Sequence, residues 1–248
     1  MSGDGAGRPI PRRVRAIRWT VGRVARAAGP KRVGGVALRA AALTTPTPEE
    51  VLGNHLRGVV LFGSPYSSIS AHHWERFPTR AIITSETVHV PKRMRPIQRR
   101  TGYEVRFDED FERIISSCRR DGESWITEEV VDLYRRLHAL GFVATVGTYL
   151  EGRLVGGLWG LEIARTFSIM SVFHLAAHAG TVAQVGVFDR IGPDGRWDLV
   201  ESGQLNEHYA RFGARSVPTE RFCELLMQSL AGSMEARRDA AGEAGPSA

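Results

Sequence analysis

The sequence predicts an α+β protein in which helices pack on a mixed β-sheet. Two regular helical patterns stand next to each other between about residues 108 and 141, and a β-hairpin pattern follows over 142–160. After the hairpin, short stretches rich in β-branched and aromatic residues alternate with helical stretches up to about residue 230. This order of elements is typical of one sheet covered by helices.

The two leading helices are predicted from apolar spacing and from their ends. We expect Asp108 to cap the first and Gly122 to lie past its end, while Thr127 caps the second and Gly141 stops it. Apolar residues three and four apart form the buried face of the first helix: Phe111, Ile114, Ile115 and Cys118.

The hairpin is predicted around Glu151-Gly152, because residues 142–150 and 153–160 on either side are rich in Val, Thr, Tyr and Leu. The remaining elements are expected in this order: a strand over about 166–173, a helix over 174–190, a turn at 192–195, a strand near 197–203, a helix ending at Gly213, a strand near 215–217 and a helix from Thr219 to about 230.

Four segments are expected along the chain. They are a basic N-terminal arm (1–48), a small lobe (49–104), a larger domain (105–230) and a fraying tail (231–248). Residues 1–40 hold ten Lys and Arg against one Asp, a net charge of +9, so the rest of the chain carries −3 of the total of +6. Residues 12–28 have the spacing of a basic amphipathic helix that would lie on a polyanion or an anionic membrane face. A solubilising extension is the alternative.

Composition excludes several classes of protein. No apolar run reaches the roughly 18 residues that a membrane span needs, and the arm lacks the apolar core of a secretion signal. Two cysteines are too few for a disulfide framework. We therefore expect a cytoplasmic protein without stable membrane insertion.

Several motifs follow one another in the middle of the chain: Ser124-Trp125-Ile126-Thr127, then Tyr134, Leu137, His138 and Gly141, then Leu154 to Gly160. Flanking strings are His89 to Arg95, Phe167 to Phe173, Leu205-Asn206-x-His208 and Phe212-Gly213-Ala214. In this order they resemble the leucyl/phenylalanyl-tRNA–protein transferases, over roughly residues 50 to 230. The resemblance implies an acyltransferase-like (GNAT-type) fold and transfer of an amino acid from aminoacyl-tRNA to an amine. An aminoacyl ester is already activated, so we expect no cofactor and no metal.

The family places an Asp and, two residues later, a Gln on one strand. Aligned through Leu205 to His208, the Asp falls on Glu201 and the Gln on Gly203, with Gln204 one place late. A regular strand would point Gln204 away from Glu201, whereas a bulge at Ser202-Gly203 would restore the pair. The resemblance thus implies Glu201 and Gln204 as the catalytic pair; a solvated charge at a strand end is the alternative.

Two departures from the family concern the amine acceptor. Met170, followed by Ser171, stands where the family has the Glu of Gly-Glu-Ser-Met-Phe, and Gly147 stands where it has the Glu of Ser-x-Glu-x-Trp. Recognition of a buried cation normally needs a counter-charge. We therefore expect an acceptor other than Arg- or Lys-tipped proteins, such as a small molecule or peptide in specialised metabolite biosynthesis. The alternatives are tagging of Arg- or Lys-tipped proteins for degradation and a non-catalytic tRNA-binding protein.

The donor side is predicted from two further groups of residues, in a protein expected to be a monomer. Four residues would wall an apolar hole for the aminoacyl side chain, with ordinary core as the alternative: Leu158, Phe167, Val172 and Phe173. Trp74 would stack on the terminal adenine, and a basic run would hold tRNA phosphates, with a solvated loop as its alternative: Lys92, Arg93, Arg95, Arg99 and Arg100.

Overall fold

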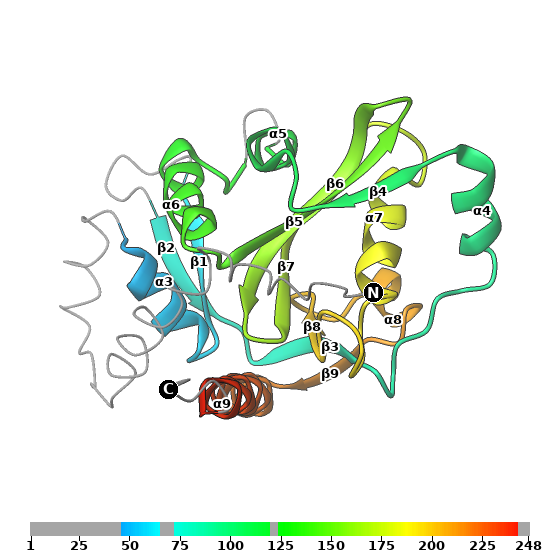
Figure 1. The fold of residues 1–248 in the computed structure, drawn as a ribbon. Coiled ribbons are helices and arrows are strands. Elements are labelled where there is room, and N and C mark those ends of the chain that lie inside the picture. Colours follow the sequence, from blue (N-terminus) through cyan, green and yellow to red (C-terminus); the bar gives the residue numbers. More distant parts are fainter. Residues whose placement is uncertain (1–45, 65–71, 120–123, 243–248) are drawn as a thin grey trace, which may run out of the picture.

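A computed structural model describes residues 46–64, 72–119 and 124–242 of the chain. A seven-stranded sheet forms its centre, in the order β4-β5-β6-β7-β8-β3-β9 (Figure 1). Only β7 and β8 pair in parallel, and the other neighbours are antiparallel. The predicted α+β fold with a mixed sheet is confirmed. The strands are β3 (Thr79–Thr84), β4 (Glu104–Phe107), β5 (Val143–Leu150), β6 (Arg153–Ile163), β7 (Thr166–His174), β8 (Leu199–Glu201) and β9 (Arg215–Pro218).

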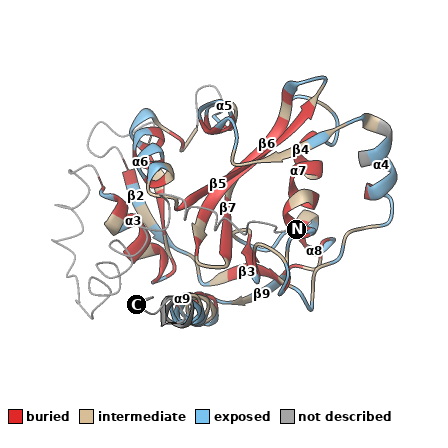
Figure 2. Cartoon of the chain, in the orientation of Figure 1, coloured by how far each residue is buried: buried red, intermediate tan, exposed pale blue. Residues whose placement is uncertain are grey.

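Two hydrophobic clusters cover the two faces of this sheet, and Figure 2 shows the central strands as its most buried part. The first cluster includes Val143 and packs under α5 (Phe111–Ser117) and α6 (Glu128–Ala139). The second includes the next residue, Ala144, and packs under α7 (Ala179–Phe188). Neighbouring residues of a strand point to opposite faces, so the clusters lie on opposite sides of the sheet.

A smaller unit stands beside the sheet. It consists of α3 (Pro48–His55) and an antiparallel pair of strands, β1 (Val59–Gly63) and β2 (His72–Arg76), and α3 and β1 contact α6. The next strand, β3, leaves this unit and lies between β8 and β9 in the large sheet. The division of the chain at residue 104 stays a prediction, with the qualification that β3, from the expected small lobe, is an inner strand of the large sheet.

Local signals located most of the elements. Thr127 accepts the N–H of Val130 (3.4 Å) at the start of α6, and Gly141 follows its end with φ +83, so both predicted ends are confirmed. The hairpin is confirmed as β5 and β6. The helix predicted over 174–190 begins only at Ala179, because β7 continues to His174.

Two predicted boundaries are wrong. Asp108 does not cap α5: the helix begins at Phe111 after Asp110, and the Asp108 carboxylate instead pairs with Arg196 (2.7 Å). The last helix, α9 (Thr219–Gly242), does not fray from residue 231, because Ala, Met, Glu and Arg favour helix. The arm and its helix over 12–28 lie outside the described residues. None of the described helices has the length and apolarity of a membrane span.

Candidate active site

A buried ion pair joins two neighbouring strands of the sheet. Arg80 on β3 donates through Nη1 to Oε1 of Glu201 at the end of β8 (3.1 Å), and the side chains are 2% and 3% exposed. Nη2 of Arg80 donates to the carbonyl of Gly58 (2.7 Å), and the N–H of Gly203 donates to the same Oε1 of Glu201 (2.7 Å). Glu201 is therefore held through one oxygen, while Oε2 takes part in neither contact.

The chain bulges directly after Glu201. Ser202 donates its N–H to the carbonyl of Ala81 (3.0 Å), and Ala81 donates its N–H to the carbonyl of Gly203 (2.6 Å). Two residues thus face one, and Gly203 has φ +77, a conformation suited to glycine. The sequence left open whether the chain bulges at Ser202-Gly203, and the structure contains the bulge. Gln204 behind it is exposed and makes no hydrogen bond to the buried Glu201, so its catalytic role stays a prediction.

A histidine of the small unit reaches the same face of the sheet. Ser168 on β7 pairs with Glu201 across the parallel ladder, and His55 at the end of α3 contacts its hydroxyl (Nε2 to Oγ, 2.9 Å). Burial and, to a smaller extent, the charge of Arg80 lower the pKa of His55 to about 3. The imidazole is therefore neutral and links α3 to the centre of the sheet.

Because His55 is buried and neutral, we expect the free energy of unfolding to fall in mild acid. The pKa of His55 is about 3 in the folded state and about 6.5 in the unfolded chain. Between these two pH values the unfolded chain binds a proton that the folded protein does not, which favours unfolding. The full stability is therefore present only above about pH 6.5. From pH 7 to pH 5 we expect His55 to remove about 2 kcal/mol from the free energy of unfolding, measured by urea titration. His55→Gln should flatten this dependence, and the exposed His89→Gln should not. Equal pH dependence in the two variants would contradict the assignment.

The residues predicted on the acceptor side, Met170 and Ser171, lie at an irregularity in β7. Trp159 of β6 pairs with Ser171, but the next residue, Gly160, pairs with Ile169, so Met170 is an extra residue between them. Met170 and Ser171 are half-buried, and Met170 packs against the cluster on the Glu201 face. The residue in place of the family's carboxylate thus lies on the same face of the sheet as Glu201.

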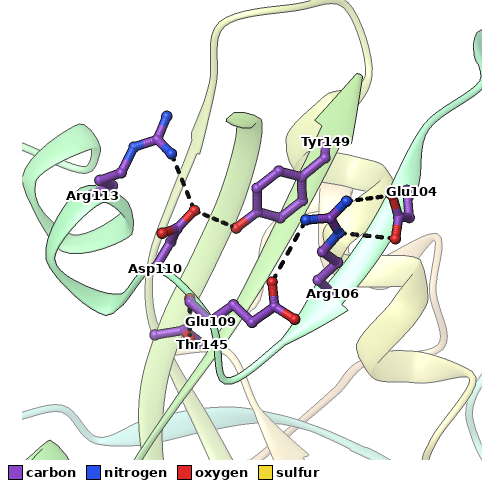
Figure 3. A network of polar contacts seen from close by, with 7 residues as sticks. All are labelled: Glu104, Arg106, Glu109, Asp110, Arg113, Thr145 and Tyr149. Atoms are coloured by element: carbon purple, nitrogen blue, oxygen red, sulfur yellow. Dashed lines mark hydrogen bonds and ion pairs between the residues drawn. The ribbon is translucent and has the colours of Figure 1, made fainter. Parts of the chain in front are cut away.

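A polar network occupies the region of Gly147, the second departure (Figure 3). The guanidinium of Arg106, which lies opposite Gly147 in the β4–β5 register, stacks on the ring of Tyr149 (4.5 Å), and the Tyr149 hydroxyl donates to Asp110 (2.8 Å). A Cβ atom at Gly147 would stand 2.6 Å from the Tyr149 ring. Tyr149 therefore fills the space that a side chain at position 147 would need.

The four residues expected to wall the donor hole are divided between the two faces. Leu158, Phe167 and Val172 belong to the core under α7, where Phe167 stacks on Trp197 (4.9 Å between centroids). Phe173 lies on the Glu201 face, against Gly157. The structure therefore does not gather the four into one wall.

An aromatic group on the Glu201 face was not singled out as a site by sequence reasoning. Trp159 is fully buried and meets Tyr134 edge-on (4.6 Å), and Trp125 lies 6.0 Å from Trp159 and 5.4 Å from Phe62 on β1. Trp74 on β2 also packs against this cluster. Trp125, Tyr134 and Trp159 belong to the motifs on which the family resemblance rests, and these motifs were the sequence signal that could have identified the aromatic group.

The basic run falls on and before α4 (Met94–Thr101), an exposed helix (Figure 2). Arg95 forms a double hydrogen bond with Asp189 (2.5 and 2.6 Å), which offsets its charge. Lys92, Arg93 and Arg99 are exposed, and the side chain of Arg100 is outside the described structure. In the described parts of the chain, no three His, Cys, Asp or Glu side chains gather as a metal site would need.

Comparison with known proteins gives one consistent family. A family profile described as leucyl/phenylalanyl-tRNA protein transferase matches residues 82–227. The chain is 35% identical to the leucyl/phenylalanyl-tRNA–protein transferase of Myxococcus xanthus over 188 residues (74% of this chain, 79% of the relative). It is 30% identical to that of Herpetosiphon aurantiacus (74% and 94%). A GCN5-related N-acetyltransferase from Kribbella flavida superposes with a TM-score of 0.32 at 14% identity, over 57% of this chain and 54% of that one.

Proposed function

The chain belongs to the leucyl/phenylalanyl-tRNA–protein transferase family and is an aminoacyltransferase that acts from aminoacyl-tRNA; we propose that its acceptor is the N-terminal amine of a protein. The observation that carries the proposal is the match over three quarters of the chain to relatives whose names state a protein acceptor. These relatives give no support to the small-molecule acceptor expected from Met170 and Gly147. The donors we propose are leucyl- and phenylalanyl-tRNA.

The reaction is one acyl transfer. The amine nitrogen attacks the ester carbonyl, a C–N bond forms, the C–O bond to the terminal ribose breaks, and the proton lost by the amine balances the one gained by the ribose oxygen. We assign proton acceptance to Oε2 of Glu201, because Arg80 and the N–H of Gly203 both occupy Oε1. Ser168 pairs with Glu201 across the parallel ladder, and Met170 packs against the cluster on the same face.

The acceptor's first side chain is the finer part of the proposal. Met170 supplies no charge on the Glu201 face, and Tyr149, with Arg106 stacked on its ring, closes the space at Gly147. Neither position itself supplies a counter-charge for a cationic side chain. The carboxylates around Gly147 are already paired with arginines, Glu104 and Glu109 with Arg106 and Asp110 with Arg113. We therefore propose that the enzyme prefers proteins with an uncharged first residue.

Transfer to a panel of peptides tests both parts. Labelled leucine and phenylalanine should pass from tRNA to peptides with a free N-terminus and not to the same peptides after N-acetylation. Met170→Glu should raise the preference for Arg- over Ala-tipped peptides by roughly 10–100-fold, the effect of one hydrogen bond to a charged group, and Met170→Gln is the matched control. Label found only in small amines would overturn the protein acceptor. A wild-type preference for Arg- or Lys-tipped peptides would overturn the uncharged first residue.

A further inference from the structure

A cavity of about 350 Å³ lies on the other side of the sheet from the ion pair and is lined by residues of α4, the first turn of α7 and α8 (Glu207–Ala210). Figure 1 shows where these three helices lie. Met94, Ile97 and Phe212 form its apolar part. Its polar lining comes from separate parts of the chain and contains no Asp or Glu: Arg93, His178, Thr181, His208 and Arg211.

Two arginines bring charge to this cavity from different elements. Arg93 stands at the N-terminal end of α4, and Arg211 follows α8. Arg211 forms a 3.6 Å contact with the exposed Glu207. Arg95 differs, because Asp189 holds its guanidinium in a double hydrogen bond and it does not line the cavity. Two guanidinium groups line this cavity and no acidic side chain does, so the cavity favours binding of an anion.

Three further polar side chains complete the wall. The hydroxyl of Thr181 lies in the first turn of α7, and His178 before it has a left-handed backbone (φ +65) and forms no side-chain cap on that helix. The first-turn N–H groups of a ten-residue helix add positive potential at this end. His208 is fixed by its Nε2 contact with Gln184 Oε1 (2.6 Å), which places its ring at the cavity.

We propose that this cavity binds a phosphate group and, resting on the proposed function, that the phosphate is a backbone phosphodiester of the aminoacyl-tRNA. A phosphate accepts several hydrogen bonds at once, which suits two guanidinium groups and a hydroxyl that converge from three elements. The site would position the tRNA without reading its sequence. Free inorganic phosphate shares this chemistry and is the other source to be tested.

Salt titration of binding of deacylated tRNA to the full-length chain tests the proposal. Each phosphate contact contributes about 0.9 to the slope of log Kobs against log[salt], so Arg93→Gln and Arg211→Gln should each reduce it by about 1. The matched control is Arg221→Gln, an exposed arginine on α9 that, like Arg211, contacts an exposed Glu close to it in the sequence. An unchanged slope in both cavity variants, or an equal fall in all three, would overturn the proposal.

Two more measurements distinguish a tRNA phosphate from free inorganic phosphate as the ligand. If the ligand is tRNA, inorganic phosphate should compete with it weakly. Effective competition should need phosphate concentrations far above those that would saturate a site specific for the free ion. Tight phosphate binding that both cavity variants abolish, with an unchanged tRNA slope, would assign the cavity to a free anion and overturn the tRNA role. The salt slope is measured with deacylated tRNA, so it can be determined even if the chain transfers no amino acid. Failure of the proposed transfer reaction would therefore leave the test of the phosphate site intact. Arg211→Lys, which keeps the charge, should preserve the slope.

Discussion

Replacing Glu201 by Gln is expected to lower the rate of amino-acid transfer by about 10²–10⁴-fold per folded molecule, the range for loss of a general base. Gln has nearly the shape of Glu, but its amide cannot accept the proton of the attacking amine. The bulge that holds Glu201 is formed by backbone hydrogen bonds of Ala81, Ser202 and Gly203, which the substitution leaves in place. The measurement is single-turnover transfer of labelled amino acid from tRNA to a free-amine peptide.

Two controls make this result specific. Glu201→Asp keeps a carboxylate and should retain far more activity than Glu201→Gln. Glu162→Gln removes a different carboxylate, one paired with Arg196 (2.6 Å), and should transfer at a rate close to that of the unmodified chain. Rates are divided by the folded fraction of each variant. If Glu201→Gln then transfers at the wild-type rate, Glu201 serves the fold alone and the assignment of the base is wrong.

Arg80→Met is expected to lower the free energy of unfolding by about 3–5 kcal/mol, because it leaves the buried carboxylate of Glu201 without its counter-charge. That is a large part of the roughly 5–15 kcal/mol that holds a typical domain folded. The exposed pair of Arg95 and Asp189 gives the control, since water screens it and Arg95→Met should cost much less. Urea unfolding followed by circular dichroism measures both variants.

The double variant Arg80→Met/Glu201→Gln distinguishes charge pairing from packing. When both charges are removed, no buried ion is left alone, so the double loss should be clearly smaller than the sum of the single losses. Strict additivity would mean that Arg80 stabilises the fold through its contacts with Gly58, Phe77 and Phe222 rather than through Glu201.

The sequence by itself determined the elements whose signals are local. Thr127 and Gly141 bound α6, and Glu151-Gly152 turns the hairpin, because caps and turns depend on a few neighbouring residues. The sequence showed where a bulge could form, at Ser202-Gly203, but the structure decided that it does. The motifs also placed the chain in its family, since their order along the chain is a property of the sequence.

Only the tertiary structure decided which residues meet. Arg80, 121 positions before Glu201, is its partner because β3 pairs with β8 in the sheet, and no periodicity of the sequence specifies the neighbours of a strand. The contact of His55 with Ser168 and the basic cavity lined by α4, α7 and α8 also join residues that are far apart in the sequence, so only the structure shows them. The extra residue Met170 in β7 likewise determines that Phe173 lies on the Glu201 face of the sheet while Phe167 lies on the α7 face. Side chains of a strand alternate between faces, and one unpaired residue changes which set faces the site.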